Sequence, residues 1–275
     1  MKKMPGIDPL GVETRPPRVL VPDMSANREG EEIPLRKEES THLRARRLRD
    51  GDEVIALDGK GVWARAAVAR RGTAVVLLTF EGKPGLGSPS RPSSLASLPG
   101  EPSLRVTILL GCAEPARVEW AVEKGTECGA AAFVLLETAR SQRAHVAALR
   151  TRLPRLSRIA AEATKQCDRT IVPGVEGPGK IGVFLQGEEI RGDPRRRLLL
   201  ADSSGAPLED RISSSSFSTA LARGVAVAIG PEGGFTPAEI SLFEESGALR
   251  VSLGPRILRL ETAVVAALTL LVAGR

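Results

Sequence analysis

A segment rich in glycine, proline and serine interrupts the chain before its midpoint. Residues 82–103 read GKPGLGSPSRPSSLASLPGEPS and show no apolar period. Such a composition opposes helix and strand, because glycine is costly to order and proline lacks an amide donor. We therefore expect a linker or long exposed loop here. The 275 residues are enough for a domain on either side, and we predict domains at residues 1–81 and 104–275.

The first half has the pattern of short strands. Runs rich in β-forming residues occupy Glu53 to Leu57, Gly61 to Val68 and Ala74 to Phe80, and Asp58-Gly59 is a turn signal between the first two. This pattern predicts a small antiparallel barrel or sheet. It contains no acid–base constellation, which favours a binding module over a catalytic one.

Positive charge gathers in clusters along the chain. The net charge is +6 and the sequence pI is about 9.6. One cluster leads into the first strand, and a second occupies Arg195 to Arg197. Residues of the first cluster are His42, Arg44, Arg46, Arg47 and Arg49. Clustered arginines favour a polyanion through phosphate neutralisation, although a solvated basic surface is the alternative.

The second half alternates between strand and helix patterns. A helical stretch with Val118, Ala121, Val122 and Gly125 on one face separates two apolar strands. A strand–helix–strand unit of this length predicts a parallel sheet. The predicted strands are residues 105–110, 131–136, 197–201, 225–229 and 250–253, and further helices are predicted at 154–166 and 260–273.

Two unusual loops follow predicted strands, where ligands bind in open α/β sheets. The first is Gly230-Pro231-Glu232-Gly233-Gly234, and a helix start with a capping box follows it at Thr236 to Glu239. The second runs from Leu253 to Arg259 and places arginines beside apolar residues. Either loop alone is compatible with a purely structural turn. Neither matches a dinucleotide fingerprint, a phosphate loop or a nucleophile elbow.

Several classes of protein are disfavoured. The three cysteines, Cys112, Cys128 and Cys167, are widely spaced and the chain has two histidines, so we expect neither a disulfide framework nor a metal site. The longest apolar stretch, Ala263 to Ala273, is far shorter than the roughly 20 residues that span a bilayer. Prolines interrupt the basic amino terminus where a signal peptide needs an apolar run. We expect a cytoplasmic protein with no membrane segment.

Together the two loops resemble a known family. IGPEGGFTPAE (Ile229 to Glu239) and LGPRILRLETA (Leu253 to Ala263) are similar to the signature of the RsmE-type 16S ribosomal RNA uridine N3-methyltransferases of the SPOUT superfamily. VEKGTECG, Arg140-Ser141, EATKQCDR and the amino-terminal HLRARRLRDGDEV add to the resemblance, which covers nearly the whole chain.

The resemblance implies a fold, a cofactor and partners. The fold would be α/β, with a carboxyl-terminal, trefoil-knotted SPOUT domain containing a parallel sheet and an amino-terminal PUA-like β-barrel. S-adenosyl-L-methionine (SAM) would be the cofactor, 16S ribosomal RNA or the small ribosomal subunit the substrate, and a homodimer the assembly. The implied cofactor-binding residues are Leu200, Ala201, Ile229, Gly230, Pro231, Gly233, Gly234, Leu253, Gly254, Ile257 and Leu258.

Candidate catalytic and RNA-binding residues follow from the same loops. Methylation at N3 requires removal of a proton, for which Glu232 and Glu261 are the nearest carboxylates, while Arg259 could stabilise the developing anion. A turn stabiliser, a helix-terminal charge and a dimer salt bridge are the respective alternatives. With two Trp, six Phe and no Tyr, arginine planes are the expected stacking partners for a flipped base. Candidate RNA contacts near the loops are Arg117, Arg140 and Arg256.

Two segments depart from the family pattern, and other functions remain open. Residues 113–117 read AEPAR where relatives carry a lysine–glycine pair, and residues 203–216 have turn and low-complexity character. One alternative function is another SPOUT chemistry, such as ribose 2′-O-methylation. The other is a non-catalytic RNA-binding or ribosome-assembly factor.

Overall fold

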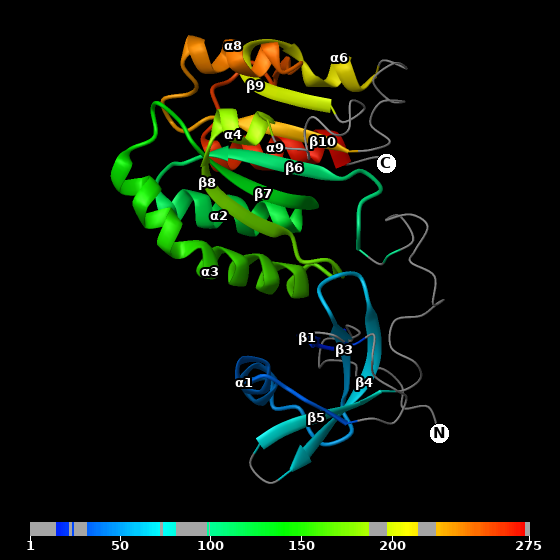
Figure 1. Ribbon diagram of the computed structural model, residues 1–275. Coiled ribbons are helices and arrows are strands. Elements are labelled where there is room, and N and C mark those ends of the chain that lie inside the picture. Colours follow the sequence, from blue (N-terminus) through cyan, green and yellow to red (C-terminus); the bar gives the residue numbers. More distant parts are fainter. Residues whose placement is uncertain are drawn as a thin grey trace. The chain divides into compact units, whose positions relative to one another are not determined.

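The computed structural model describes residues 15–21, 24, 32–71, 74–80, 98, 100–186, 197–213 and 224–272. These residues form two compact units (Figure 1). The first contains the described residues up to 80 together with Asp168–Ile171, and the second contains the rest. Residues 82–97 and 99 of the predicted linker lie outside the described residues, as do Arg195 and Arg196 of the second basic cluster.

A five-stranded sheet forms the first unit. Its order is β1-β3-β4-β5-β2, with β1 parallel to β3 and the other neighbours antiparallel. The strands are β1 (Arg18–Leu20), β2 (Glu32–Pro34), β3 (Glu53–Leu57), β4 (Trp63–Arg71) and β5 (Ala74–Phe80). β3 and β5 have the predicted bounds. β4 begins later and runs further than predicted, because its pairing with β5 continues to Arg71.

A helix in the basic segment completes this unit. α1 (Lys37–Ala45) occupies a stretch where the sequence analysis predicts no helix. Leu43 is its apolar anchor and is fully buried in a core with Val19 and Val54. Because mean apolarity is low over α1, tertiary packing of that leucine is what holds the helix in place. The adjacent arginines point to solvent.

The second unit is built on a six-stranded parallel sheet. Its order is β11-β9-β10-β6-β7-β8, and every neighbouring pair is parallel. The strands are β6 (Val106–Gly111), β7 (Ala130–Glu137), β8 (Gly174–Lys180), β9 (Arg197–Pro207), β10 (Val225–Ile229) and β11 (Leu249–Ser252). All five residues of β10 are buried, as expected for a strand covered on both faces.

Helices cover both faces of this sheet. Alternate residues of β10 separate two cores: Val225, Val227 and Ile229 face one, and Ala226 and Ala228 face the other. The first core contains buried residues of α2 (Pro115–Glu127), α3 (Arg143–Gln166) and α9 (Leu260–Val272). The second contains buried residues of α4 (Ile181–Gln186) and α8 (Pro237–Glu245). Residue Ala273 of the predicted last helix lies outside the described residues.

The predicted start of the helix at 154–166 is wrong. α3 begins eleven residues earlier, at Arg143, and Pro154 lies inside it. Proline interrupts the backbone hydrogen bonding of a helix, which is why it reads as a start. Val146 and Leu149 are buried before it and Leu156 after it, so packing against the sheet carries the helix through the proline.

The segment predicted to have turn and low-complexity character is largely regular over its described part. β9 extends to Pro207, and α6 (Leu208–Ile212) follows directly. The extension pairs with β11 after a register shift. A Cβ atom at Gly205 would lie 2.5 Å from the amide nitrogen of Val251, so only glycine permits this approach. Residues 214–216 lie outside the described residues.

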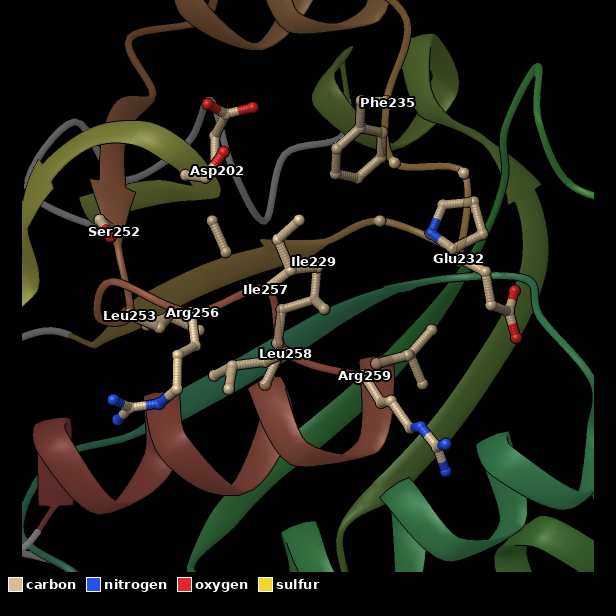
Figure 2. Close-up of a pocket in the computed structure, with 18 of the residues that line it drawn as sticks. Asp202, Ile229, Glu232, Phe235, Ser252, Leu253, Arg256, Ile257, Leu258 and Arg259 are labelled. Atoms are coloured by element: carbon tan, nitrogen blue, oxygen red, sulfur yellow. The ribbon is translucent and has the colours of Figure 1, made fainter.

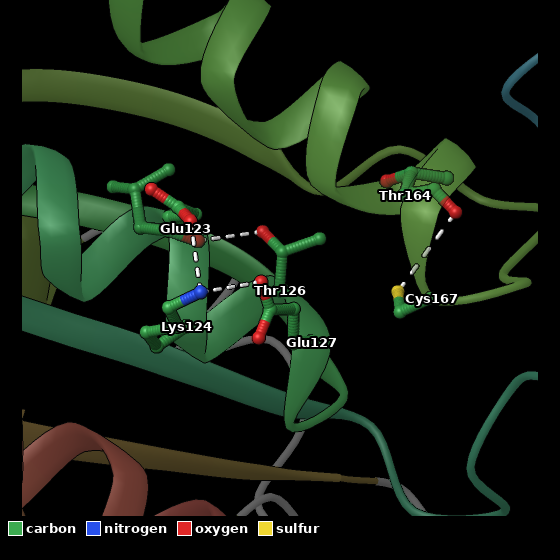
Figure 3. A network of polar contacts seen from close by, with 7 residues as sticks. Glu123, Lys124, Thr126, Glu127, Thr164 and Cys167 are labelled. Atoms are coloured by element: carbon green, nitrogen blue, oxygen red, sulfur yellow. Dashed lines mark hydrogen bonds and ion pairs between the residues drawn. The ribbon is translucent and has the colours of Figure 1, made fainter.

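Charged side chains near the carboxyl end of α2 form ion pairs with one another (Figure 3). The Lys124 ammonium donates hydrogen bonds of 2.8 Å to both Glu123 and Glu127. Those two carboxylates raise the pKa of Lys124. This helix therefore presents a compensated surface, in contrast to its neighbour α3.

Candidate functional site

A cavity of about 660 Å³ opens at the carboxyl ends of the parallel strands (Figure 2). The loops that follow β10 and β11, and residues 201–203 of β9, form most of its wall. These three strands are neighbours in the sheet, although they are distant in the chain. The lining residues are Arg117, Arg140, Ala201, Asp202, Ser203, Ile229, Gly230, Pro231, Glu232, Gly233, Gly234, Phe235, Ser252, Leu253, Gly254, Arg256, Ile257, Leu258, Arg259, Leu260 and Ala263.

The loop after β10 is a tight turn anchored at its far end. The Gly234 amide donates to the Pro231 carbonyl at 2.8 Å, and Gly234 has φ +68°, a conformation that favours glycine. The predicted capping box is present at the start of α8: Thr236 accepts from the Glu239 amide and Glu239 accepts from the Thr236 amide. The helix start therefore fixes where the turn ends.

The neighbouring loop after β7 also holds this turn. Arg140 donates to the carbonyl of Gly233 at 2.5 Å, and the Ala139 amide donates to Glu239 at 2.7 Å. Arg140, predicted as an RNA contact, thus also stabilises the loop after β10, which forms part of the cavity wall. Its side chain remains exposed.

The loop after β11 supplies an apolar wall with charged ends. Leu253 and Leu258 are partly buried against the core, whereas Ile257 is 96% exposed. Arg256 and Arg259 are also exposed and line the cavity, and neither forms an ion pair with any described residue. Flat apolar ligands and anionic ligands can both be accommodated by such a surface.

Asp202, Ser203 and Ser252 line the cavity and escaped the sequence analysis. The Ser204 hydroxyl, at 2.5 Å, holds the pKa of Asp202 below its usual range, so this carboxylate is ionised at neutral pH. An ionised carboxylate beside a cavity can accept hydrogen bonds from hydroxyl groups or attract a cation. The position of Asp202 and Ser203 just after the predicted end of the strand at Ala201 was the available signal, whereas Ser252 lies inside the predicted strand 250–253.

Arg117 links both candidate proton acceptors. Its guanidinium lies 3.1 Å from Glu261, 3.4 Å from Glu232 and 3.5 Å from Glu114. These residues come from the start of α2, the loop after β10 and the start of α9. Glu232 lines the cavity and its side chain is 49% exposed, whereas Glu261 is 17% exposed and is absent from the lining. The guanidinium thus connects three elements at the cavity rim.

The remaining predicted site residues lie elsewhere. Leu200 is fully buried in the core beneath α4 and α8, and does not line the cavity. The five basic residues of the amino-terminal cluster belong to the first unit. Arg44, Arg46, Arg47 and Arg49 are exposed there, and His42 is half-buried.

Other kinds of site are not seen in the described part of the chain. No three His, Cys, Asp or Glu side chains gather there in a way that could hold a metal ion. Nor does any described helix have the length and apolarity needed to cross a bilayer. Burial raises the pKa of the Cys112 thiol to about 12, which makes it a poor nucleophile.

Two family models match the chain. Residues 100–272 match the RNA methyltransferase domain, and residues 35–78 match the RNA methyltransferase PUA domain. The first match covers more than half of the chain. The chain belongs to this RNA methyltransferase family. The resemblance inferred from the two loops is confirmed.

Relatives named ribosomal RNA small subunit methyltransferase E are similar in sequence to this chain over most of its length. Ribosomal RNA small subunit methyltransferase E of Synechocystis is 34% identical over 227 residues, which are 82% of this chain and 67% of the relative. The Mycobacterium tuberculosis protein of the same name is 29% identical over 229 residues, 81% of this chain and 79% of the relative.

Solved structures share the fold. Ribosomal RNA small subunit methyltransferase E from Neisseria gonorrhoeae, bound to SAM, matches with a TM-score of 0.75 at 24% identity and covers 93% of this chain and 96% of that one. A Legionella pneumophila protein in complex with SAM matches with a TM-score of 0.73 at 25% identity, covering 94% and 97%. The predicted class, an α/β SPOUT domain with an amino-terminal PUA-like domain, is confirmed.

Proposed function

We propose that this protein is a SAM-dependent methyltransferase that modifies N3 of a uridine in 16S ribosomal RNA. Membership of the RNA methyltransferase family and the named relatives support this activity. The observation that carries the proposal is the meeting of both glycine-containing loops around one cavity at the carboxyl edge of the sheet.

The cavity has the size and chemistry that SAM requires. Its volume of about 660 Å³ lies within the usual range for small-molecule sites. Gly230, Gly233 and Gly234 present backbone groups without side chains in the way, and Leu253 and Leu258 offer apolar walls for an adenine ring. When bound, SAM supplies an electrophilic methyl group on a sulfonium. We propose that these residues hold it, together with Ala201, Ile229, Pro231, Gly254 and Ile257.

Glu232 is the better placed of the two candidate proton acceptors. It lines the cavity and is more exposed than Glu261, so a uridine entering the cavity can reach its carboxylate. In this proposal Glu232 accepts the N3 proton as the N3–methyl bond forms, and Arg259 stabilises the negative charge that develops on the base. Glu261, through Arg117, keeps Glu232 in position.

A single substitution tests the role of Arg259. Arg259 is exposed, lines the cavity and has no ion-pair partner among the described residues, so its removal should not disturb the fold. We expect Arg259→Ala to lower the single-turnover rate at least tenfold while SAM affinity stays within about twofold of the wild type. An unchanged single-turnover rate would contradict the role.

Binding of the RNA is proposed to involve both units. Residues 1–81 would act as an RNA-binding domain through the cluster from His42 to Arg49, residues 82–103 as a linker, and residues 104–275 as the catalytic domain. Arg117, Arg140 and Arg256 at the cavity would contact the RNA near the target base. We further propose a trefoil knot, a homodimer and, because the substrate is ribosomal RNA, a cytoplasmic location.

Methyl transfer from labelled SAM tests the whole proposal. The acceptors are 16S ribosomal RNA and small subunits that lack the modification, followed by nucleoside mass spectrometry. We expect labelled 3-methyluridine. A label on the ribose 2′-oxygen would instead indicate the other SPOUT chemistry. Absence of SAM binding in a calorimetric titration would leave only a non-catalytic RNA-binding factor.

A further inference from the structure

The outer face of α3 carries more positive charge than the ion pairs among the described residues neutralise. The helix contains five arginines and one lysine, and Glu162 is its only acid. Lys165 pairs with that glutamate at 2.8 Å. Arg152 and Arg155 both bind Glu119 of α2, at 3.0 and 2.8 Å. The arginines that remain are Arg143, Arg150 and Arg158.

These three side chains lie on one exposed stripe. Arg150 lies seven residues after Arg143, and Arg158 lies eight residues after Arg150. Each separation is close to two helical turns, so the three side chains leave the helix on the same side. All three are exposed, and Ala147 and Thr151, also exposed, leave only small side chains between them. At 1.5 Å per residue the stripe is about 22 Å long. Figure 1 shows α3 on the outside of its unit, with α2 between it and α9.

In the part of the chain that the structure describes, Arg150 is the only one of the three arginines with a partner in the second unit, since it pairs with Glu137 and donates a hydrogen bond of 3.5 Å to the Pro178 carbonyl. Among the described residues, Arg143 and Arg158 have no carboxylate partner within ion-pair distance, and Arg150 reaches only one carboxylate, that of the exposed Glu137, at 3.6 Å. Arg143 also lies in the first turn of α3, where positive charge opposes the helix dipole. Its position is therefore unfavourable for the isolated helix, whereas on α2 the partly exposed cation Lys124 is compensated by two carboxylates (Figure 3).

We propose that the stripe Arg143–Arg150–Arg158 is a second phosphate-binding surface, which holds RNA that continues from the cavity. Arg143 lies only three residues after Arg140, which lines the cavity. The stripe therefore begins near the opening of the cavity. This inference rests on the proposed function, because it assumes that the cavity receives a base of an RNA.

The chemistry of the stripe matches RNA phosphates. Guanidinium groups bind phosphate oxygens in pairs and release condensed counterions from the polyanion. A membrane surface would require large apolar residues beside the arginines. Apart from Arg152 and Arg155, which bind Glu119, the exposed residues between the stripe arginines are Ala144, Ala147, Thr151, Pro154 and Ser157. A sequence-independent phosphate track fits a substrate that extends well beyond its target base.

Single and double substitutions in the full-length protein test the surface. The variants are Arg143→Gln, Arg158→Gln and the double variant, and the matched control is Arg105→Gln. Arg105 is an exposed arginine that immediately precedes β6. It therefore lies at the amino ends of the parallel strands, whereas the cavity lies at their carboxyl ends. The measured quantities are the affinity for unmodified 16S RNA at several salt concentrations, SAM affinity and the melting temperature.

We expect the salt dependence to fall with each stripe arginine removed. The slope of log affinity against log salt should fall by about 0.7 to 0.9 per arginine, hence by about 1.5 in the double variant. KM for RNA should rise about tenfold in the double variant at low salt, with kcat, SAM affinity and melting temperature unchanged. Arg105→Gln should retain the wild-type slope.

Two results would overturn the inference. The first is a double variant whose slope equals that of Arg105→Gln. The second is weakened binding to assembled subunits with unchanged binding to naked RNA, which would make a ribosomal protein the partner. If the wild type fails to transfer a methyl group, the proposed function fails, and the slopes measured on the same RNA still decide the inference.

Discussion

Gly111, the last residue of β6, packs directly against the loop after β10, which lines the cavity. A Cβ atom at this position would lie 2.5 Å from Cδ and 2.6 Å from the nitrogen of Pro231, and 3.0 Å from the carbonyl carbon of Gly230. Ordinary carbon–carbon contacts are about 3.5 to 4 Å, so Pro231 would have to move by about 1 Å. The proline nitrogen is backbone, and no rotamer change can relieve this contact.

The displacement should affect both stability and cofactor binding. Overpacking of this kind costs about 1–3 kcal/mol, which lowers the melting temperature by roughly 3–9 °C in a unit of this size. Because Gly230 and Pro231 line the cavity, part of the strain distorts the site itself. We expect Gly111→Ala to weaken SAM binding at least tenfold, which corresponds to about 1.4 kcal/mol.

Calorimetric titration with SAM and thermal denaturation measure the two effects. Gly174→Ala is the matched control, since a Cβ atom at Gly174, in β8, would meet nothing within 4 Å. That variant should bind SAM normally and melt at the wild-type temperature or slightly above it. The reasoning is refuted if Gly111→Ala binds SAM within about twofold of Gly174→Ala and melts within about 1 °C of it.

Three further predictions follow from the ion pairs, the cap and the buried thiol. Arg117→Met removes the cation next to Glu261 and should lower the free energy of unfolding by about 1 kcal/mol, because the pairs are partly exposed, while single-turnover rates fall more than SAM affinity. Urea denaturation and rapid-quench kinetics measure this, and equal losses in rate and SAM affinity would contradict a positioning role. Thr236→Ala removes the acceptor for the Glu239 amide and should cost about 1 kcal/mol in urea denaturation, whereas an unchanged midpoint would show that the cap contributes nothing. Cys112 should remain a protonated thiol throughout the neutral range, because its pKa of about 12 means that the thiolate forms only as the pH approaches that value. We therefore expect it to react with a thiol reagent at pH 8 only after denaturation. Rapid reaction in the native protein would disprove its burial.

Local conformation was largely predictable from the sequence. The bounds of Glu53–Leu57, Ala74–Phe80 and Val225–Ile229 agree with the structure, because short runs of β-branched and apolar residues favour extended backbone. Thr236 to Glu239 starts a helix as predicted, since a capping box acts within four residues. Both cavity loops were likewise recognisable as contiguous segments.

Long-range packing decided what periodicity could not. α3 runs through Pro154 because its neighbours on both sides of the proline are buried. β8 reads GVEGPGK, with no strand pattern, and exists because it pairs with β7. Leu200 was expected at the cofactor site, yet the alternation of β9 turns its side chain into the core on the far side of the sheet.

The arrangement of the site belongs to the tertiary structure alone. The sequence identified the loops that follow β10 and β11, because turn signals depend on neighbours along the chain. The end of β9 at Pro207, six residues beyond the predicted end, depends instead on its pairing with β11. The insertion of β9 between β10 and β11 brought the two loops and residues 201–203 of β9 together. The packing of α2 beside α9 placed Arg117 against Glu261, 144 residues away. Such encounters depend on which apolar faces bury each other, a property of the whole fold that no local pattern encodes.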